Sequence, residues 1–204
     1  VTLVAAANEA TITFTGGGTT FYGLVAQADG ALIVNKLVTG SSGITSLNGD
    51  SDNTGDTAAD SIAFADALTI TAGTTMTLAA HTAGVTAAGT LTLKAQAGVH
   101  ISHSVTGSTG KAIVINADSD STGTSGTFTM ADTKTLTSTN SDVTITAYDV
   151  NLAGSVTANK GKVVAGTASI TIHGAEAGQT IGIGGIGANM HIADAELANL
   201  SGSG

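Results

Sequence analysis

Apolar residues and threonines alternate along almost the whole chain, and helical periodicity is nearly absent. Short runs such as Ala67-Leu-Thr-Ile-Thr71, Thr90-Leu-Thr-Leu93 and Asp142-Val-Thr-Ile-Thr146 place an apolar side chain at every second position. A period of two puts the apolar residues on one face of a β-strand and the threonines on the other. Each run ends in Gly, Asn or Asp, residues that turn the chain. The pattern therefore predicts many short strands, each with one buried and one solvated face.

The predicted strands recur at a regular interval of about 6 to 9 residues. Their centres are Leu68, Met76, Val85, Leu91, Val99, Val105, Ile113, Phe128, Leu136, Val143, Val150, Val156, Val163 and Ile170. Three steps make about 22 residues, and a repeat near this length is typical of one coil of a solenoid. We therefore predict an all-β fold, a parallel β-helix or β-solenoid with about three short strands per coil and about nine coils.

A longer repeat overlies the short one. Leu47-Asn-Gly-Asp-Ser-Asp-Asn-Thr-Gly55 matches Ile115-Asn-Ala-Asp-Ser-Asp-Ser-Thr-Gly123 after a shift of 68 positions. No linker is evident between the matching parts. The sequence therefore predicts a single β-solenoid domain over residues 1–204, with related blocks at about 44–111 and 112–180.

The composition fits strands that are paired on both sides. The chain contains no Pro, which would remove a hydrogen-bond donor from a sheet, and only 10% of its residues are charged. The ends of such a stack are exposed sheet edges, and neither terminus predicts a cap helix of ordinary length, although Ala193–Leu200 has the pattern of two helical turns. Unpaired edges favour stacking on another copy, and a head-to-tail contact that does not close makes a filament.

Charge and residue usage exclude several function classes. The net charge is −9 and the six cationic side chains are all lysines, which disfavours binding to a nucleic-acid backbone. The absence of Cys excludes disulfides and thiolate metal sites, and it is compatible with an oxidising exterior. No apolar run is long enough to predict a membrane span.

The repeats also carry a family resemblance over about residues 45–200. Ala67-Leu-Thr-Ile-Thr-Ala-Gly73, Thr75-Met-Thr-Leu-Ala-Ala80 and Gly89-Thr-Leu-Thr-Leu-Lys-Ala95 resemble the haemagglutination-type repeats of filamentous haemagglutinin-like exoproteins. The Asn-x-Asp-Ser-Asp segments and Ile172–Ile183 resemble recurring phrases of giant repetitive bacterial surface proteins. The resemblance implies a right-handed parallel β-helix, a secreted or surface-attached location, and an adhesive or fibre-forming role.

Two acidic loops are the most specific candidates for a binding site. Asp50-x-Asp52-x-Thr54-Gly55-Asp56 and Asp118-x-Asp120-x-Thr122-Gly123 repeat the front half of a calcium-loop spacing, in which alternate residues point at one centre. The Glu expected at the twelfth position is replaced by Ser61 and Thr129. One interpretation is therefore calcium bound by Asp50, Asp52, Asp56, Asp118 and Asp120. The other is that both loops are hydrated Asx turns. Strand counting leaves open whether the two loops share a face.

The five histidines are scattered, but His81 and His103 are 22 positions apart, which predicts that they stack on successive coils. Parallel β-helices also include polysaccharide lyases, and Asp50 with Asp52 or Asp118 with Asp120 offers a carboxylate pair. The chain, however, has no Trp, only two Tyr and no Arg, so it lacks the usual sugar platforms. We predict no catalytic residues and no cofactor beyond calcium.

Together these features predict a structural protein. The first hypothesis is an extracellular fibre or matrix subunit that assembles with itself head to tail through open β-helix ends. The alternative is a surface adhesin fragment that binds glycans or cell surfaces, and a lyase-like enzyme is a remote third hypothesis. All three place the chain outside the cell or on its surface.

Overall fold

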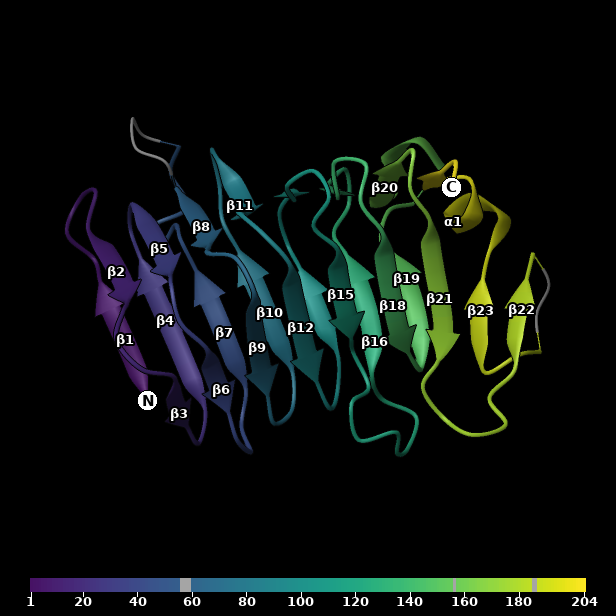
Figure 1. Ribbon diagram of the computed structural model, residues 1–204, viewed down its shortest axis with the longest axis horizontal. Coiled ribbons are helices and arrows are strands. Elements are labelled where there is room, and N and C mark those ends of the chain that lie inside the picture. Colours follow the sequence, from purple (N-terminus) through teal and green to yellow (C-terminus); the bar gives the residue numbers. More distant parts are fainter. Residues whose placement is uncertain (56–59, 156, 185–186) are drawn as a thin grey trace.

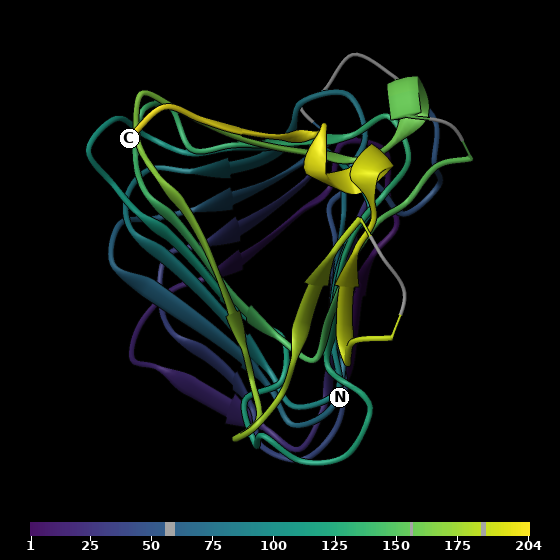
Figure 2. The same cartoon turned by 90° about the vertical axis from the view of Figure 1, so that its right-hand side faces the viewer.

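The alternating runs form strands that stack into three parallel sheets. The computed structural model describes residues 1–55, 60–155, 157–184 and 187–204. In Figure 1 the strands follow one another along the long axis, from the N-terminal end to the C-terminal end. Seen along that axis, the three sheets surround the core like the sides of a prism (Figure 2). The predicted parallel β-helix with three short strands per coil is confirmed.

Each coil adds one strand to each sheet in turn. Sheet A consists of β1 (Thr2–Ala5), β4 (Leu24–Ala28), β7 (Thr45–Asn48), β10 (Met76–Ala79), β13 (Val99–Ile101), β16 (Thr127–Met130) and β19 (Asp149–Leu152). Sheet B consists of β2 (Thr11–Phe14), β5 (Ala31–Val34), β8 (Ser61–Phe64), β11 (Gly84–Ala87), β14 (Val105–Thr106), β17 (Thr135–Thr137), β20 (Lys162–Gly166) and β24 (Leu200–Gly202). Sheet C consists of β3 (Thr19–Phe21), β6 (Val38–Gly40), β9 (Leu68–Ala72), β12 (Leu91–Ala95), β15 (Ile113–Asn116), β18 (Val143–Ala147) and β21 (Ile170–Gly174).

The C-terminal end departs from this regular winding. A separate pair of strands, β22 (Ile181–Ile183) and β23 (Met190–Ile192), lies beyond β19, and the β23 residue His191 donates its N–H to Asp149 on β19 at 3.1 Å. The helix α1 (Asp194–Leu197) is one turn long, shorter than the two turns predicted over Ala193–Leu200. A 3-10 turn, η1, spans Thr157–Asn159.

The predicted strand positions agree closely with the structure. Thirteen of the predicted centres, from Leu68 to Val150 and then Val163 and Ile170, fall within β9 to β21. The remaining centre, Val156, lies outside the described residues. Period-two alternation is reliable here because both neighbours of each strand are strands of the same kind, so the burial pattern alone decides the face.

The number of coils is smaller than predicted. Sheets A and C each hold seven strands and sheet B holds eight, against about nine coils expected. Most partners in the register of sheet A are 21 to 23 positions apart, but Ser46 and Thr77 are 31 apart and His100 and Thr129 are 29 apart. The extra residues form the two acidic loops, 49–60 and 117–126. The same chain length therefore builds fewer coils.

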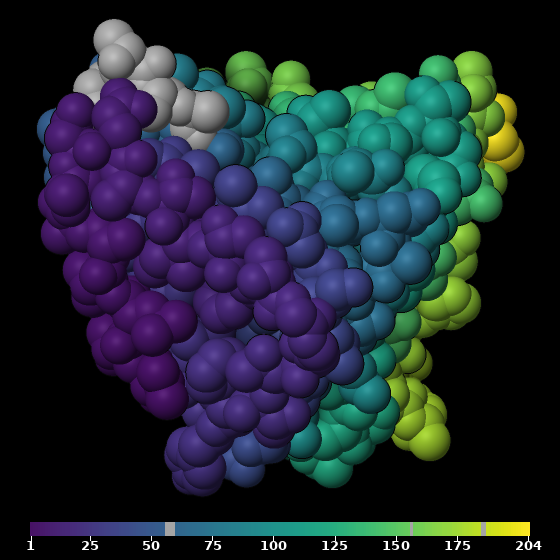
Figure 3. All heavy atoms as spheres, turned by 60° about the vertical axis from the view of Figure 1, so that its left-hand side comes forward, coloured from purple at the N-terminus to yellow at the C-terminus, as the bar shows by residue number. Residues whose placement is uncertain are grey.

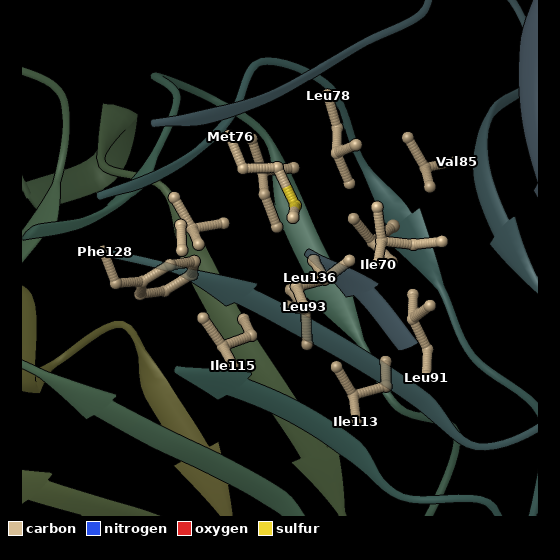
Figure 4. Packing of buried hydrophobic residues seen from close by; sticks show 14 of the residues in the cluster. Ile70, Met76, Leu78, Val85, Leu91, Leu93, Ile113, Ile115, Phe128 and Leu136 are labelled. Carbon is tan, nitrogen blue, oxygen red and sulfur yellow. The ribbon is translucent and has the colours of Figure 1, made fainter. Parts of the chain in front are cut away.

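Inward side chains stack in columns along the axis. In sheet C the register aligns Ile70, Leu93, Ile115, Ile145 and Ile172. The first four are at most 1% exposed. Figure 4 shows the first three of them, Ile70, Leu93 and Ile115, packed with residues of the other two sheets in the core. Burying each such side chain contributes about 1.5–3 kcal/mol. The columns of small and branched residues therefore hold successive coils in register.

The central column predicts a large effect of truncating one of its members. Leu93→Ala should lower the free energy of unfolding by about 2–5 kcal/mol, because it leaves a cavity between Ile70 and Ile115. The measurement is chemical denaturation followed by circular dichroism. Thr92→Ala on the outer face of the same strand is the control and should lose less than about 1 kcal/mol. Equal losses would contradict the assignment of the two faces.

Candidate functional site

Several acidic side chains at the corners of the coils accept hydrogen bonds from the backbone of the neighbouring coil. Asp29 accepts from the N–H of Glu9 at 2.9 Å, Asp66 from that of Thr90 at 2.9 Å, and Asp142 from that of Ser169 at 3.1 Å. Asp66 also forms an ion pair with Lys111, whose Nζ lies 2.6 Å from a carboxylate oxygen. These carboxylates link one coil to the next, so their role is structural.

The first acidic loop follows β7, and several of its side-chain oxygens accept hydrogen bonds from within it, although Oδ2 of Asp50 is buried without a partner among the described residues. Asp50 accepts from the N–H of Asn53 at 2.8 Å, and Asn48 Oδ1 accepts from the N–H of Asp50 at 3.0 Å. Asp52 accepts from the N–H of Thr54 at 3.0 Å and from its hydroxyl at 2.9 Å. These bonds lower the pKa of Asp52. The geometry is that of the Asx turn that was one of the two interpretations. Asp56 lies outside the described residues.

The second acidic loop follows β15 and leaves its oxygens without donors. Asp118 is 1% exposed, and neither of its carboxylate oxygens has a hydrogen-bond partner among the described residues. The amide Oδ1 of Asn116 is likewise buried without a partner there. Burial, followed by the neighbouring carboxylate of Asp120, raises the pKa of Asp118 to about 6. Two loops of nearly the same sequence therefore differ in how their polar atoms are satisfied.

Gly126 explains how Asp118 becomes buried. This residue has φ +99°, in the left-handed region, and a Cβ at this position would lie 2.3 Å from the Cβ of Asp118. Only a residue without a side chain lets the end of the loop fold back over Asp118 in this way. Gly49 plays a comparable role in the first loop, where a Cβ would lie 2.0 Å from the carbonyl oxygen of Ser61.

The two loops lie at different corners of the prism. Loop 49–60 connects β7 of sheet A to β8 of sheet B, whereas loop 117–126 connects β15 of sheet C to β16 of sheet A. Three full coils after β7, the chain returns to the same corner at β16. The second loop follows β15, one strand earlier, and therefore leaves from a different corner. The carboxylates of the two loops therefore do not combine into one site, which answers the question that strand counting left open.

A second polar cluster forms beside the first loop. The rings of His81 and His103 stack on successive coils as predicted, with centroids 6.4 Å apart. Asp60, fully buried, accepts a hydrogen bond from the hydroxyl of Thr82 at 2.9 Å. Its other oxygen has no partner among the described residues. Asp60 was not predicted as a site residue, although it precedes Thr82 by 22 positions, the coil repeat, which is a signal that sequence reasoning could have used.

This cluster lines a shallow cavity of about 290 Å³, whose walls include Asp50, His81, His103 and Lys134. Burial lowers the pKa of His103, and the charge of Lys134 adds to this effect. Burial raises the pKa of Asp50, and the charge of Asp60 reinforces it. Within the described ranges, however, no three His, Cys, Asp or Glu side chains are arranged to hold a metal ion.

Comparison with protein-family models, with curated protein sequences and with solved structures finds no match for this chain. None of the helices in the described part of the chain is long and apolar enough to cross a membrane. Function is therefore argued from the fold and from the contacts of individual residues.

Asp118 predicts a characteristic dependence of stability on pH. Because folding raises its pKa to about 6 from 3.8, the folded chain keeps a proton that the unfolded chain has released. The contribution of Asp118 to stability therefore falls as the pH rises from about 4 to about 6 and stays low above that range. Asp118→Asn removes this loss and should raise the free energy of unfolding at pH 7.5 by about 1–2 kcal/mol.

The measurement is a series of denaturant titrations between pH 4 and pH 8 with a chelator present. The gain in Asp118→Asn should disappear near pH 4. Asp52→Asn in the first acidic loop, at the position equivalent to Asp120, is the control; the pKa of Asp52 is lowered rather than raised, so this variant should show no such gain. A variant at Asp118 that is no more stable than the wild type at pH 7.5 would refute the assigned shift.

Proposed function

We propose that this protein is a structural subunit of an extracellular fibre or matrix, and that its copies join head to tail through the open ends of the β-helix. The observation that carries the proposal is that the apolar columns of the core are unfinished at both ends. Half-buried Leu3, Ile12 and Phe21 begin them, and half-buried Ile170, Ile172 and Leu200 end them. These residues pack on the core from one side only.

The N-terminal end presents three strand edges. β1, β2 and β3 are the first strands of sheets A, B and C, and each pairs with only one neighbouring strand. Figure 3 turns this end forward, and residues of the first coil, in purple, form its surface. Val1 and Val4 are 65% and 58% exposed there. An unpaired edge with apolar side chains is a template for another strand.

The C-terminal end presents a matching apolar hollow of about 640 Å³. It is lined by Ile170, Ile172, Ile181, Ile183, Ile192, Leu197 and Leu200, among others. Ile183 and Leu197 are 62% and 43% exposed, so the hollow opens to solvent. The last strands beside it are β21 of sheet C, β24 of sheet B and the edge strand β22.

The helix α1 covers only one corner of this end. Glu196 on α1 accepts hydrogen bonds from the N–H groups of Leu152 and Ala193, each at 3.0 Å. It thereby satisfies one backbone donor at the edge strand β19. In Figure 2, α1 lies over the corner between sheets A and B. A one-turn helix is too small to complete the core.

A second copy of this chain is the partner that fits both ends. The N-terminal end is a cross-section of the three-sheet prism, and the C-terminal end offers the last strands of sheets B and C beside the pair β22 and β23, with parallel strands about 4.8 Å apart within each sheet. Stacking β2 on β24 of another copy would continue the column that runs from Ile12 through Leu32 to Leu200. Stacking β3 on β21 would continue sheet C. The contact is heterologous and does not close, so it generates a filament.

An extracellular location is part of the same proposal. The absence of Cys suits an oxidising exterior, and the few charges suit a stack in which like side chains lie directly above one another. The resemblance to repetitive surface exoproteins supports the same location.

A lysine placed at one end of the protein should block that end's part of the contact and leave the part at the other end intact. Leu3→Lys puts a charge on the half-buried inward side of the N-terminal strand, and Ile183→Lys puts one on the rim of the C-terminal hollow. Each variant alone should stay monomeric, because an unpaired charge opposes burial of the joint. An equimolar mixture should form dimers and nothing longer, because each variant keeps one intact end. Sedimentation velocity and electron microscopy provide the measurement.

The unmodified chain should form thin rods whose length grows with concentration. Thr92→Lys, on the outer face of sheet C in the middle of the stack, is the matched control and should assemble like the wild type. Compact wild-type monomers at every concentration would contradict the proposal. Assembly of the two end variants on their own would show that the contact lies elsewhere.

A further inference from the structure

We infer that the second acidic loop, residues 117–126, is a calcium site in which Asp118 and Asp120 supply carboxylate oxygens and Asn116 supplies its amide oxygen. This inference is independent of the proposed assembly. It depends on three buried acceptor atoms, both oxygens of Asp118 and Oδ1 of Asn116, that have no donor among the described residues.

Such atoms are costly to bury. An acceptor removed from water without a partner costs about 1–3 kcal/mol, and more if it carries charge. A side chain 1% exposed cannot recover this through bulk water. The three atoms are all acceptors, so their partner must be a donor or a cation, and one cation can serve more than one of them.

Nearby charges strengthen the case for a divalent ion. Asp120 lies close enough to Asp118 to raise its pKa, and the charge of Glu176, from the corner after β21, acts in the same direction. A single proton would neutralise one of these carboxylates and satisfy one of the free oxygens. An ion with two positive charges can contact both carboxylates at once.

The first loop provides an internal comparison. It carries the same Asn-x-Asp-Ser-Asp sequence, but there Asn48, Asp52 and one oxygen of Asp50 accept hydrogen bonds from within the loop, and of these three side chains only Oδ2 of Asp50 is buried without a partner among the described residues. Sequence alone does not distinguish the two loops. The structure assigns the cation to the second loop, where both oxygens of Asp118 and Oδ1 of Asn116 are left without a donor.

Calcium is the ion that this donor set favours. It binds carboxylate and amide oxygens in a flexible geometry and completes its shell with backbone carbonyls and water, so a third carboxylate is not required. Thr129, at the position of the missing bidentate Glu, is held in β16 between His100 and Asn151 in the register of sheet A. A site with so few charges should be weak, with Kd of about 10⁻⁴–10⁻³ M.

The experiment is a calorimetric titration of the full chain, stripped with a chelator, with calcium chloride at pH 7.5. We expect about one ion per chain and a rise in the thermal unfolding temperature. Asp118→Asn and Asp120→Asn should each weaken binding at least tenfold. Their matched controls, Asp50→Asn and Asp52→Asn at the equivalent positions of the first loop, should bind like the wild type. Circular dichroism confirms that each variant keeps its β-structure.

Three results would overturn the inference. One is the absence of both heat and thermal stabilisation in the wild type at millimolar calcium. Another is binding that survives in Asp118→Asn and Asp120→Asn. The third is binding that is lost in the first-loop variants instead. If calcium does not bind and the Asp118–Asp120 pair takes up one proton near pH 6, the proton is the missing partner and no cation site exists.

Discussion

The whole structure depends on parallel backbone pairing between residues about one coil apart. Each strand hydrogen-bonds to the strand before it and the strand after it in the same sheet, so each inward side chain lies above one of its own kind. This alignment explains the restricted composition, because a column accepts branched apolar residues and a sheet paired on both sides rejects Pro. It also makes the two ends chemically different from the middle, since only there is the pairing unfinished.

Polar side chains that interact with the backbone lie at the corners of the coils, whereas the columns in the core are apolar. Asp and Asn side chains at these positions accept hydrogen bonds from backbone N–H groups of a neighbouring coil, as Asp29, Asp66 and Asp142 do. Corners are also the only places where a coil can be lengthened without breaking the register of the sheets. The two acidic loops use this freedom. In the first loop Asp52 and one oxygen of Asp50 accept hydrogen bonds from within the loop, and in the second both oxygens of Asp118 are buried without a donor among the described residues.

This contrast separates two ways in which an acidic motif can act. Asp52 is held by Thr54, and its charge is solvated and locally bonded. Asp118 is enclosed under Gly126, so its charge is neither solvated nor bonded by the described chain. The apolar ends and the buried Asp118 are two places where the described structure leaves interactions incomplete, and the partners that we propose for them are a second copy for the ends and a cation for the loop.

Much of this protein was determined by its sequence alone. Alternation of apolar residues and threonines located the strands, and the repeat of about 22 residues brought His81 over His103, because both are local or periodic properties. The number of coils, the separation of the acidic loops and the burial of Asp118 were decided by the tertiary structure. Residues inserted at a corner change the point in the chain at which every later coil begins. That point depends on the lengths of all preceding coils and not on any single segment. Whether a carboxylate finds a donor depends in turn on which backbone atoms that winding brings to it.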